Sequence, residues 1–509
     1  MRQTWHIFLK DARRLRYEVI VTLVLTAAYA WSQGQGSVMP TPRTWRLMQA
    51  ANLLRAYLLP MGWWFLASVA VYGEPLPGDR QFWVTRPYRW SSLLGAKLLF
   101  IIAFVSFPLL LADCFILLLQ GLRPWENPVG LLWHELAIFA VILLPMMAVA
   151  CITANFGQAV LVALATVVPI LVFGRFFGPF LGTLSEYGAN AFAFKVGGGT
   201  DSVMGIWAPL ACLVMISAAL VIMIFQYRAR RTGVSRLIFV AAVLLVLCGG
   251  RYLPDDQTFA LQSPLFKSRV DTSSITAVFS PESSPPPTLS PAPQNAERDD
   301  FTRVKLPIRF DGAPLGTAVV VEMMLAEVTP PNGKPWNTLL YFGPAPPDAV
   351  WHEAEVDRSL FDQVKGTPVR VHLNIQLTVL GNPHTQDMPL GEGSHRVPGV
   401  GLCESLPFAI RPSLLSLNCR VAFRQSAYVM ARFDGSKTEV PRVQGEMPWV
   451  QWRTHYSPYP ADFGIDPISD SNWFIPKGAT SVAFTTMKPL AHIRRELDIP
   501  NVQLAEFGN

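Results

Sequence analysis

Charged residues are scarce in this chain. Asp, Glu, Lys and Arg make up only 15% of its 509 residues, whereas 51% are hydrophobic. The formal net charge is +6, but the basic residues flank apolar runs and do not gather on a polar stretch, which argues against nucleic-acid binding. This length and composition are typical of a membrane domain joined to a soluble domain.

The sequence also lacks complete motifs of several enzyme classes. Gly435-Ser-Lys-Thr438 lacks the first glycine of a phosphate-binding loop, so we expect no ATPase site here. His134-Glu135 begins a zinc-protease motif, but Ile138 stands where the second histidine is needed. We interpret His134 and Glu135 as interfacial polar residues. No Gly-x-Ser-x-Gly nucleophile elbow occurs. We therefore expect no catalytic residue, bound metal or cofactor.

Cysteines are few, and they divide into two groups. Four lie in apolar runs and are expected to be small buried hydrophobic residues: Cys114, Cys151, Cys212 and Cys248. The other two, Cys403 and Cys419, lie in the polar C-terminal half. An isolated pair in an exported domain predicts a disulfide.

What the chain does contain is a series of apolar runs in its first half. We predict seven membrane spans, over residues 17–31, 50–72, 93–119, 131–152, 158–173, 206–225 and 236–250. Several are shorter than the roughly 20 residues that a spanning helix prefers, so tilted helices are expected.

The distribution of basic residues between the spans predicts their orientation. Residues 1–16, 73–97 and 226–236 carry about twice as many Lys and Arg residues as the alternate connections, so they are expected in the cytoplasm. The N-terminus is then cytoplasmic, and the chain after residue 250 is extracytoplasmic. Cleavage of a signal peptide after Ala28-Tyr-Ala30 is the alternative. The amphipathic pattern of Trp5, Phe8 and Leu9 favours an interfacial helix instead.

The segment 73–97 is the most distinctive stretch. It contains Gly78-Asp-Arg-Gln-Phe-Trp-Val-Thr-Arg-Pro87, followed by Leu93-Leu-Gly-Ala-Lys97 at the start of a span. Together with Lys10-Asp-Ala-Arg-Arg-Leu-Arg16, this pattern resembles the permease subunits of bacterial type 2 ABC exporters over residues 1–250.

The resemblance implies a protein of the bacterial inner membrane that works as a homodimer or heterodimer of permeases. ATP would be bound by a separate ATP-binding subunit. The 73–97 loop would dock on that subunit, through apolar, polar and shape-holding side chains: Asp79, Arg80, Phe82, Trp83, Arg86 and Pro87. An ordinary inner loop with aromatic anchors is the alternative.

Asp113 is the most conspicuous polar residue within a span. A carboxylate inside a membrane is costly and is a functional candidate, here for a transport path. It lies 16 residues after Lys97, about 24 Å along a helix, which would also let it reach water at the outer boundary. Arg55, at the start of the second span, is a possible partner.

The second half changes its periodicity. Residues 251–300 include a Pro/Ser-rich stretch and are expected to form a linker. In Val369–Val379 the odd positions are apolar and the even ones polar, as in a half-buried strand, so His372 is expected to be solvated. Further alternation, at 304–310, 318–328, 421–433 and 481–486, predicts an extracytoplasmic β domain over 301–509, most simply a β-sandwich.

Two other functional classes stay open at this point. The chain could be a membrane-anchored protein whose extracytoplasmic domain binds or senses a ligand. A polytopic membrane enzyme is the third possibility, and it has the least support because no catalytic constellation is visible. A gene for an ATP-binding subunit beside this one would favour the exporter.

Overall fold

The computed structural model divides into a helical unit and a β unit. It describes residues 2–34, 49–51, 53–73, 89–177, 207–252, 270–281, 301–331, 333–345, 350–391, 393–407, 415–423, 428–434, 450–454, 468–475 and 478–507. The helical unit comes first in the chain and the β unit second, so the predicted change of secondary structure is confirmed.

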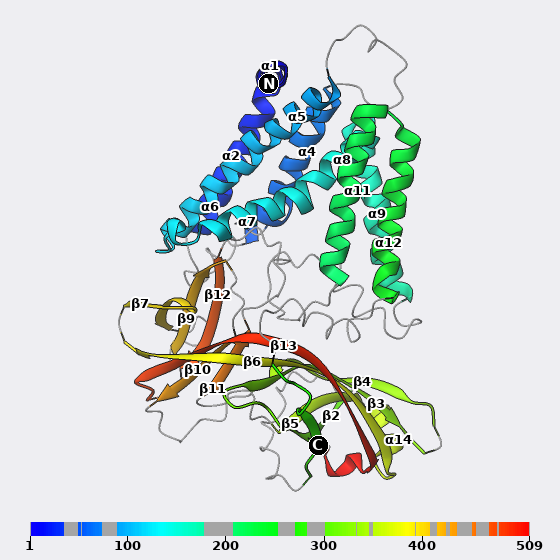
Figure 1. Ribbon diagram of the computed structural model, residues 1–509, viewed down its shortest axis with the longest axis vertical. Coiled ribbons are helices and arrows are strands. Elements are labelled where there is room, and N and C mark those ends of the chain that lie inside the picture. Colours follow the sequence, from blue (N-terminus) through cyan, green and yellow to red (C-terminus); the bar gives the residue numbers. More distant parts are fainter. Residues whose placement is uncertain are drawn as a thin grey trace. The chain divides into compact units, whose positions relative to one another are not determined.

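The helical unit contains several long helices (Figure 1). Its elements are α1 (Arg2–Arg14), α2 (Arg16–Gly34), η1 (Leu54–Leu58), α4 (Leu59–Tyr72), α5 (Trp90–Ile101), η3 (Ile102–Ser106), α6 (Phe107–Leu119), η4 (Pro124–Glu126), α7 (Pro128–Ile138), η5 (Phe139–Leu143), α8 (Leu144–Ile152), α9 (Phe156–Phe177), α11 (Trp207–Ala229) and α12 (Thr232–Tyr252).

Four helices of the described chain are long and apolar enough to cross a membrane. They are Gln49–Tyr72, Trp90–Leu119, Pro128–Ile152 and Leu210–Ala229. Two shorter apolar helices, Phe156–Thr166 and Thr232–Val246, fall on two more of the predicted runs, and α2 covers the remaining one. The helices thus coincide with the predicted runs, and the length and composition of four of them indicate membrane association.

Three of the long helices share a feature that the sequence analysis missed. The π-helical turns η1, η3 and η5 each end two residues before a proline, at Pro60, Pro108 and Pro145. Proline lacks an N–H and its ring crowds the carbonyl four residues earlier. A widened turn accommodates both effects without breaking the helix.

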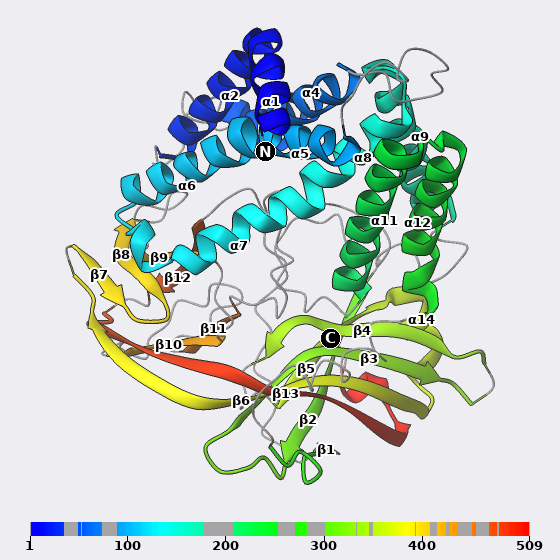
Figure 2. The same ribbon diagram turned by 45° about the horizontal axis from the view of Figure 1, so that its top comes forward.

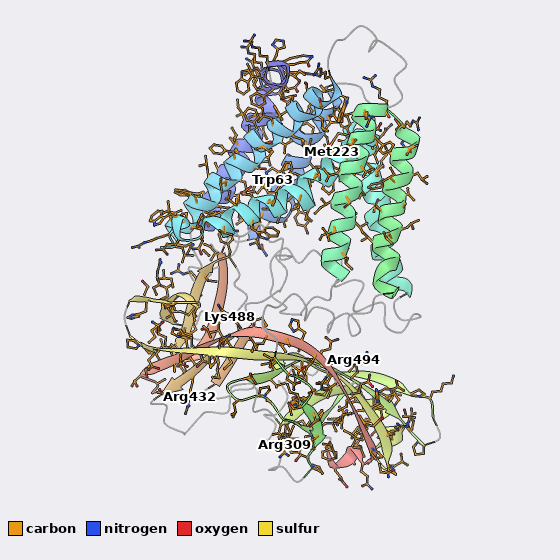
Figure 3. The ribbon with its side chains drawn as sticks, in the orientation of Figure 1. Trp63, Met223, Arg309, Arg432, Lys488 and Arg494 are labelled. Atoms are coloured by element: carbon orange, nitrogen blue, oxygen red, sulfur yellow. A yellow bond between two sulfur atoms is a disulfide. The ribbon has the colours of Figure 1, made fainter. Side chains whose placement is uncertain are left out.

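The core of this unit is built from the inward faces of its helices. Trp63 of α4 is completely buried, and Met223 of α11 is nearly so (Figure 3). Aliphatic side chains of α5, α6 and α8 complete the same cluster. Large apolar side chains such as Leu111 and Leu132 remain exposed on the outer faces. Such a surface is typical of helices solvated by lipid.

The β unit contains two antiparallel sheets (Figure 2). Its elements are β1 (Thr276–Phe279), β2 (Phe301–Asp311), β3 (Ala318–Thr329), β4 (Trp336–Ala345), β5 (Trp351–Asp357), α14 (Arg358–Val364), β6 (Val369–Pro389), β7 (Ser394–Val397), β8 (Gly401–Pro407), β9 (Leu415–Ala422), β10 (Tyr428–Asp434), β11 (Val450–Thr454), β12 (Ile468–Ile475), β13 (Ser481–Val502) and η7 (Leu504–Glu506). The larger sheet has the order β1-β2-β5-β4-β3-β6-β13-β10-β11, and the smaller has the order β12-β9-β8-β7.

The larger sheet curls around its own core, which makes it more closed than a simple sandwich. The strand β1 lies against β13, where Arg495 donates a hydrogen bond of 2.7 Å to the carbonyl of Ile275. Apolar side chains of β2, β3, β6 and β13 fill the inside. The strand β1 lies within residues 251–300, so part of the expected linker belongs to the fold, because Ile275 is buried in this core.

The smaller sheet packs on the far ends of β6, β10 and β13, forming a second core. Figure 2 shows β6 and β13 as long curved neighbours that run through both regions. Their pairing shifts register between Thr486 and Lys488 and between Pro489 and Ala491. The expected strand over 421–433 is instead two strands, since β9 ends at Ala422 and β10 begins at Tyr428.

The alternation along β6 agrees with the prediction at its odd positions but only partly at its even positions. Its odd positions from Val369 to Val379 are fully buried in the core, and His372 on the polar face is partly exposed beside Asp498, as expected. However, the polar face is also buried further along the strand, at Asn374, Gln376 and Thr378. Periodicity identifies the two faces of a strand, but it does not reveal whether a second layer covers the polar one.

Candidate functional site

The first candidate site is the contact between α1 and α5. The amphipathic pattern of the N-terminal segment produces a helix whose Ile7 and Phe8 are buried. The ring of Phe8 stacks on Phe104, with centroids 5.8 Å apart, and meets the edge of Phe100 at 6.5 Å. Trp5 stacks on the outer side of Phe8 at 5.1 Å. The apolar face of α1 is therefore attached to the following helical layer.

A buried ion pair strengthens this attachment. Lys97 Nζ of α5 lies 2.7 Å from Asp11 Oδ2 of α1, and the Lys97 side chain is completely buried. The sequence analysis counted Lys97 among the basic residues of the 73–97 loop. This assignment was wrong, because the ammonium group lies inside the helical unit opposite a carboxylate 86 residues away. Removing one member of such a pair leaves the other charge buried and uncompensated.

A second polar contact joins α1 to the end of α4. Arg14 Nη1 donates a hydrogen bond of 3.1 Å to the carbonyl oxygen of Gly73. Gly73 directly precedes the segment 74–88, and Lys97 follows it at the second turn of α5. The helix α1 thus contacts the chain on both sides of this segment.

The predicted docking residues themselves lie within 74–88, outside the described part of the chain. They are Asp79, Arg80, Phe82, Trp83, Arg86 and Pro87. The structure therefore defines how the ends of the segment are held and leaves the role of these six residues as a prediction.

The second candidate site is a buried polar cluster between α6 and α7. Asp113 Oδ2 of α6 lies 2.8 Å from His134 Nδ1 of α7, and the Asp113 side chain is completely buried. Glu135 is adjacent and 9% exposed. Ligand atoms of the three residues all lie within 4.8 Å of one another, so this set could hold a metal ion.

One possibility considered for this region was wrong. Asp113 does not reach water, because helix packing buries it together with His134 and Glu135. Arg55, the partner considered for Asp113, lies half-buried in η1. A hydrogen bond joins Asp113 to His134.

A signal for this cluster was present in the sequence. The helices α6 and α7 form a hairpin through the short connection that contains η4, as Figure 2 shows. Asp113 lies six residues before the end of α6 at Leu119, and His134 lies six residues after the start of α7 at Pro128. Residues equally distant from a tight helical turn lie at equal depth, here about 9 Å from the helix ends.

The β unit has its own buried polar group. Thr378 of β6 donates a hydrogen bond of 2.6 Å from Oγ1 to Glu322 Oε1 of β3. The same hydroxyl lies 2.9 Å from Nδ1 of His492 on β13. Because threonine has one hydroxyl proton, its donation to Glu322 makes Nδ1 of His492 the donor to Thr378. Burial lowers the pKa of His492 to about 4.

The predicted disulfide forms in the smaller sheet. Cys403 of β8 and Cys419 of β9 are bonded, with Cα atoms 4.0 Å apart, at directly opposed positions of the strand pair. Both are buried in the second core of the β unit. The bond is thus structural within this sheet.

No protein-family model matches the chain, and no curated protein matches its sequence. The functional assignment therefore depends on the geometry of the chain itself and on the resemblance of its loop.

Proposed function

We propose that this chain is the permease subunit of a type 2 ABC exporter in the bacterial inner membrane. The observation that carries the proposal is that α1 contacts the chain on both sides of segment 74–88. Before the segment, Arg14 donates a hydrogen bond to Gly73, and after it, Asp11 pairs with Lys97. A segment whose two ends are held by one amphipathic helix is suited to receive force from a soluble subunit.

In this proposal the N-terminus and segment 74–88 face the cytoplasm, and the β unit is extracytoplasmic. The density of basic residues around segment 74–88 supports this orientation. The disulfide in the β unit agrees with an oxidising compartment. Two permease chains and two ATP-binding subunits would make the working complex, and this chain would carry out no covalent chemistry.

The proposed mechanism depends on the two contacts of α1, which connect it to α5 and to the end of α4. Closure of the ATP-binding subunits would displace segment 74–88. The buried ion pair is costly to separate, so α1 and α5 would move together. The hydrogen bond from Arg14 to Gly73 would add α4 to the same movement. Displacement at the membrane face would then reorient the spans that line the transport path.

The experiment combines purification and ATPase measurements on the full chain. The chain is purified from its native membranes, and a co-purifying ATP-binding subunit is identified and reconstituted with it in nanodiscs. Trp83→Ala or Arg86→Ala should weaken association on the order of tenfold, since aromatic and guanidinium groups dominate protein contacts. Trp125→Ala and Arg123→Ala, at exposed positions of the α6–α7 connection, are the matched controls.

A second pair of variants tests the contact between Arg14 of α1 and Gly73 at the end of α4. Arg14→Ala should leave the complex assembled but reduce the response of its ATPase rate to the permease, because α4 is no longer connected to α1. Arg13→Ala, on the exposed side of the same helix, is the control. The proposal fails if no ATP-binding subunit accompanies the chain, or if Trp83→Ala and Trp125→Ala behave alike. The first of these results would favour a membrane-anchored binding or sensing protein.

A further inference from the structure

Glu135 of α7 is a buried carboxylate that the proposed coupling does not use. Its side chain is 9% exposed, and neither of its oxygens has a hydrogen-bond partner among the described residues. Transferring an ionised carboxylate out of water without a partner costs several kcal/mol. Such a group requires a proton or a cation beside it.

The surroundings of Glu135 favour a cation. The Asp113 carboxylate and the His134 imidazole lie close enough for one ligand atom of each residue to fall within 4.8 Å of the others. A tetrahedral ion with bonds of about 2.0–2.2 Å needs neighbouring ligand atoms about 3.3–3.6 Å apart. Small side-chain rotations would close this difference.

The donor set indicates the class of metal. One imidazole nitrogen and two carboxylates suit a divalent transition-metal ion, whereas Mg²⁺ and Ca²⁺ prefer oxygen ligands alone. The two negative charges balance a divalent ion. The three residues come from two helices of one hairpin, which holds them at equal depth.

We infer that Asp113, His134 and Glu135 bind one divalent transition-metal ion such as Zn²⁺, with a water molecule as the fourth ligand. The site lies between α6 and α7, about 9 Å from the hairpin connection. The inference is independent of the ABC proposal, because it uses neither segment 74–88 nor an ATP-binding subunit.

The test measures metal binding by the full chain in detergent, purified without a polyhistidine tag and stripped with a chelator. Zn²⁺ stoichiometry is measured by mass spectrometry and Co²⁺ binding by its visible absorption. The wild type should bind one ion per chain, which should raise its melting temperature. Glu135→Gln should weaken binding about tenfold or more and leave the metal-free protein at least as stable as wild type, since an uncompensated charge is removed. If Glu135 had only a structural role, its replacement would not weaken metal binding while leaving the metal-free protein as stable as the wild type.

Glu126→Gln is the matched control, because Glu126 is partly exposed in the same hairpin and pairs with Arg123. Asp113→Asn is the second variant. Asparagine can still hydrogen bond to His134 but is a poor metal ligand, so binding should again fall about tenfold or more. The inference is overturned if the wild type binds less than one ion per chain, as a cluster that only shares protons would. Unchanged affinity in both Glu135→Gln and Asp113→Asn would overturn it equally.

Discussion

Acidification should destabilise the β unit through His492 of β13, which is buried beside Thr378 of the neighbouring strand β6. Burial lowers its pKa in the folded protein to about 4, from 6.5 for an ordinary histidine. A histidine with a lowered pKa binds a proton more readily in the unfolded chain. Its stabilising contribution is therefore complete above pH 6.5 and is lost as the pH falls towards 4.

The magnitude follows from the separation of the two pKa values. About 2.5 pKa units, at about 1.4 kcal/mol each, correspond to about 3 kcal/mol when the loss is complete. At pH 5, where the folded protein is still mostly neutral at His492, the loss is about 2 kcal/mol. That is a large part of the 5–15 kcal/mol that stabilises an ordinary domain.

The assay is urea-dependent hydrogen exchange of peptides from β6 and β13 in the detergent-solubilised full chain. Opening free energies at pH 7.5 and pH 5 are compared after correction for the intrinsic exchange rates. His492→Asn keeps a donor near Thr378 but cannot take up a proton. This variant should reduce the difference in opening free energy between pH 7.5 and pH 5 by about 2 kcal/mol.

His372→Gln is the control, because His372 is a partly exposed histidine on the face of β6 that also carries Thr378, and it contacts Asp498. It should keep the wild-type difference between pH 7.5 and pH 5. The reasoning would be refuted if His492→Asn retained the full pH dependence of the wild type. The buried hydrogen bonds of His492 would then carry no protonation linkage.

Two further predictions concern single interactions. Lys97→Met should destabilise the helical unit by on the order of 3 kcal/mol, and adding Asp11→Asn should recover most of this loss, because no uncompensated carboxylate then remains buried. The control Lys365→Met removes an exposed ion pair and should cost under about 1 kcal/mol. Melting temperatures in detergent would show whether the recovery occurs. Replacing Cys403 and Cys419 together by Ala should cost the β unit about 3 kcal/mol, because the bond closes a loop of about 15 residues. Non-reducing mass mapping of native membranes should find the two cysteines linked, and free thiols there would contradict the disulfide.

Much of the secondary structure was predictable because it depends on local patterns. The apolar runs that flank segment 73–97 became helices, and the alternation over 369–379 became a strand with its odd positions in the core. Cys403 and Cys419 were predictable as a pair because the other cysteines occur in apolar runs. Hydropathy and periodicity are properties of neighbouring residues, so they can be recognised without a partner segment.

The candidate sites were less predictable because their residues are far apart in the chain. Asp11 meets Lys97 across 86 positions, and Thr378 meets His492 across 114. The apolar run marked Asp113 as unusual, but the composition of that run did not indicate its bond to His134, which only the equal distance of the two residues from the hairpin connection could have suggested. A polar residue in an apolar run has many possible partners, and local composition does not select among them.

The sequence by itself determined the kind of each segment: apolar helices first, alternating strands second, and a basic segment between two apolar runs. Only the tertiary structure decided which polar groups are removed from water. It buried Lys97 against Asp11, Glu135 beside Asp113 and His134, and the even positions of β6 from Asn374 to Thr378. The physical reason is that burial depends on what covers a residue. That covering comes from elements distant in the chain, whereas helical and strand periodicity come from the residue's own neighbours.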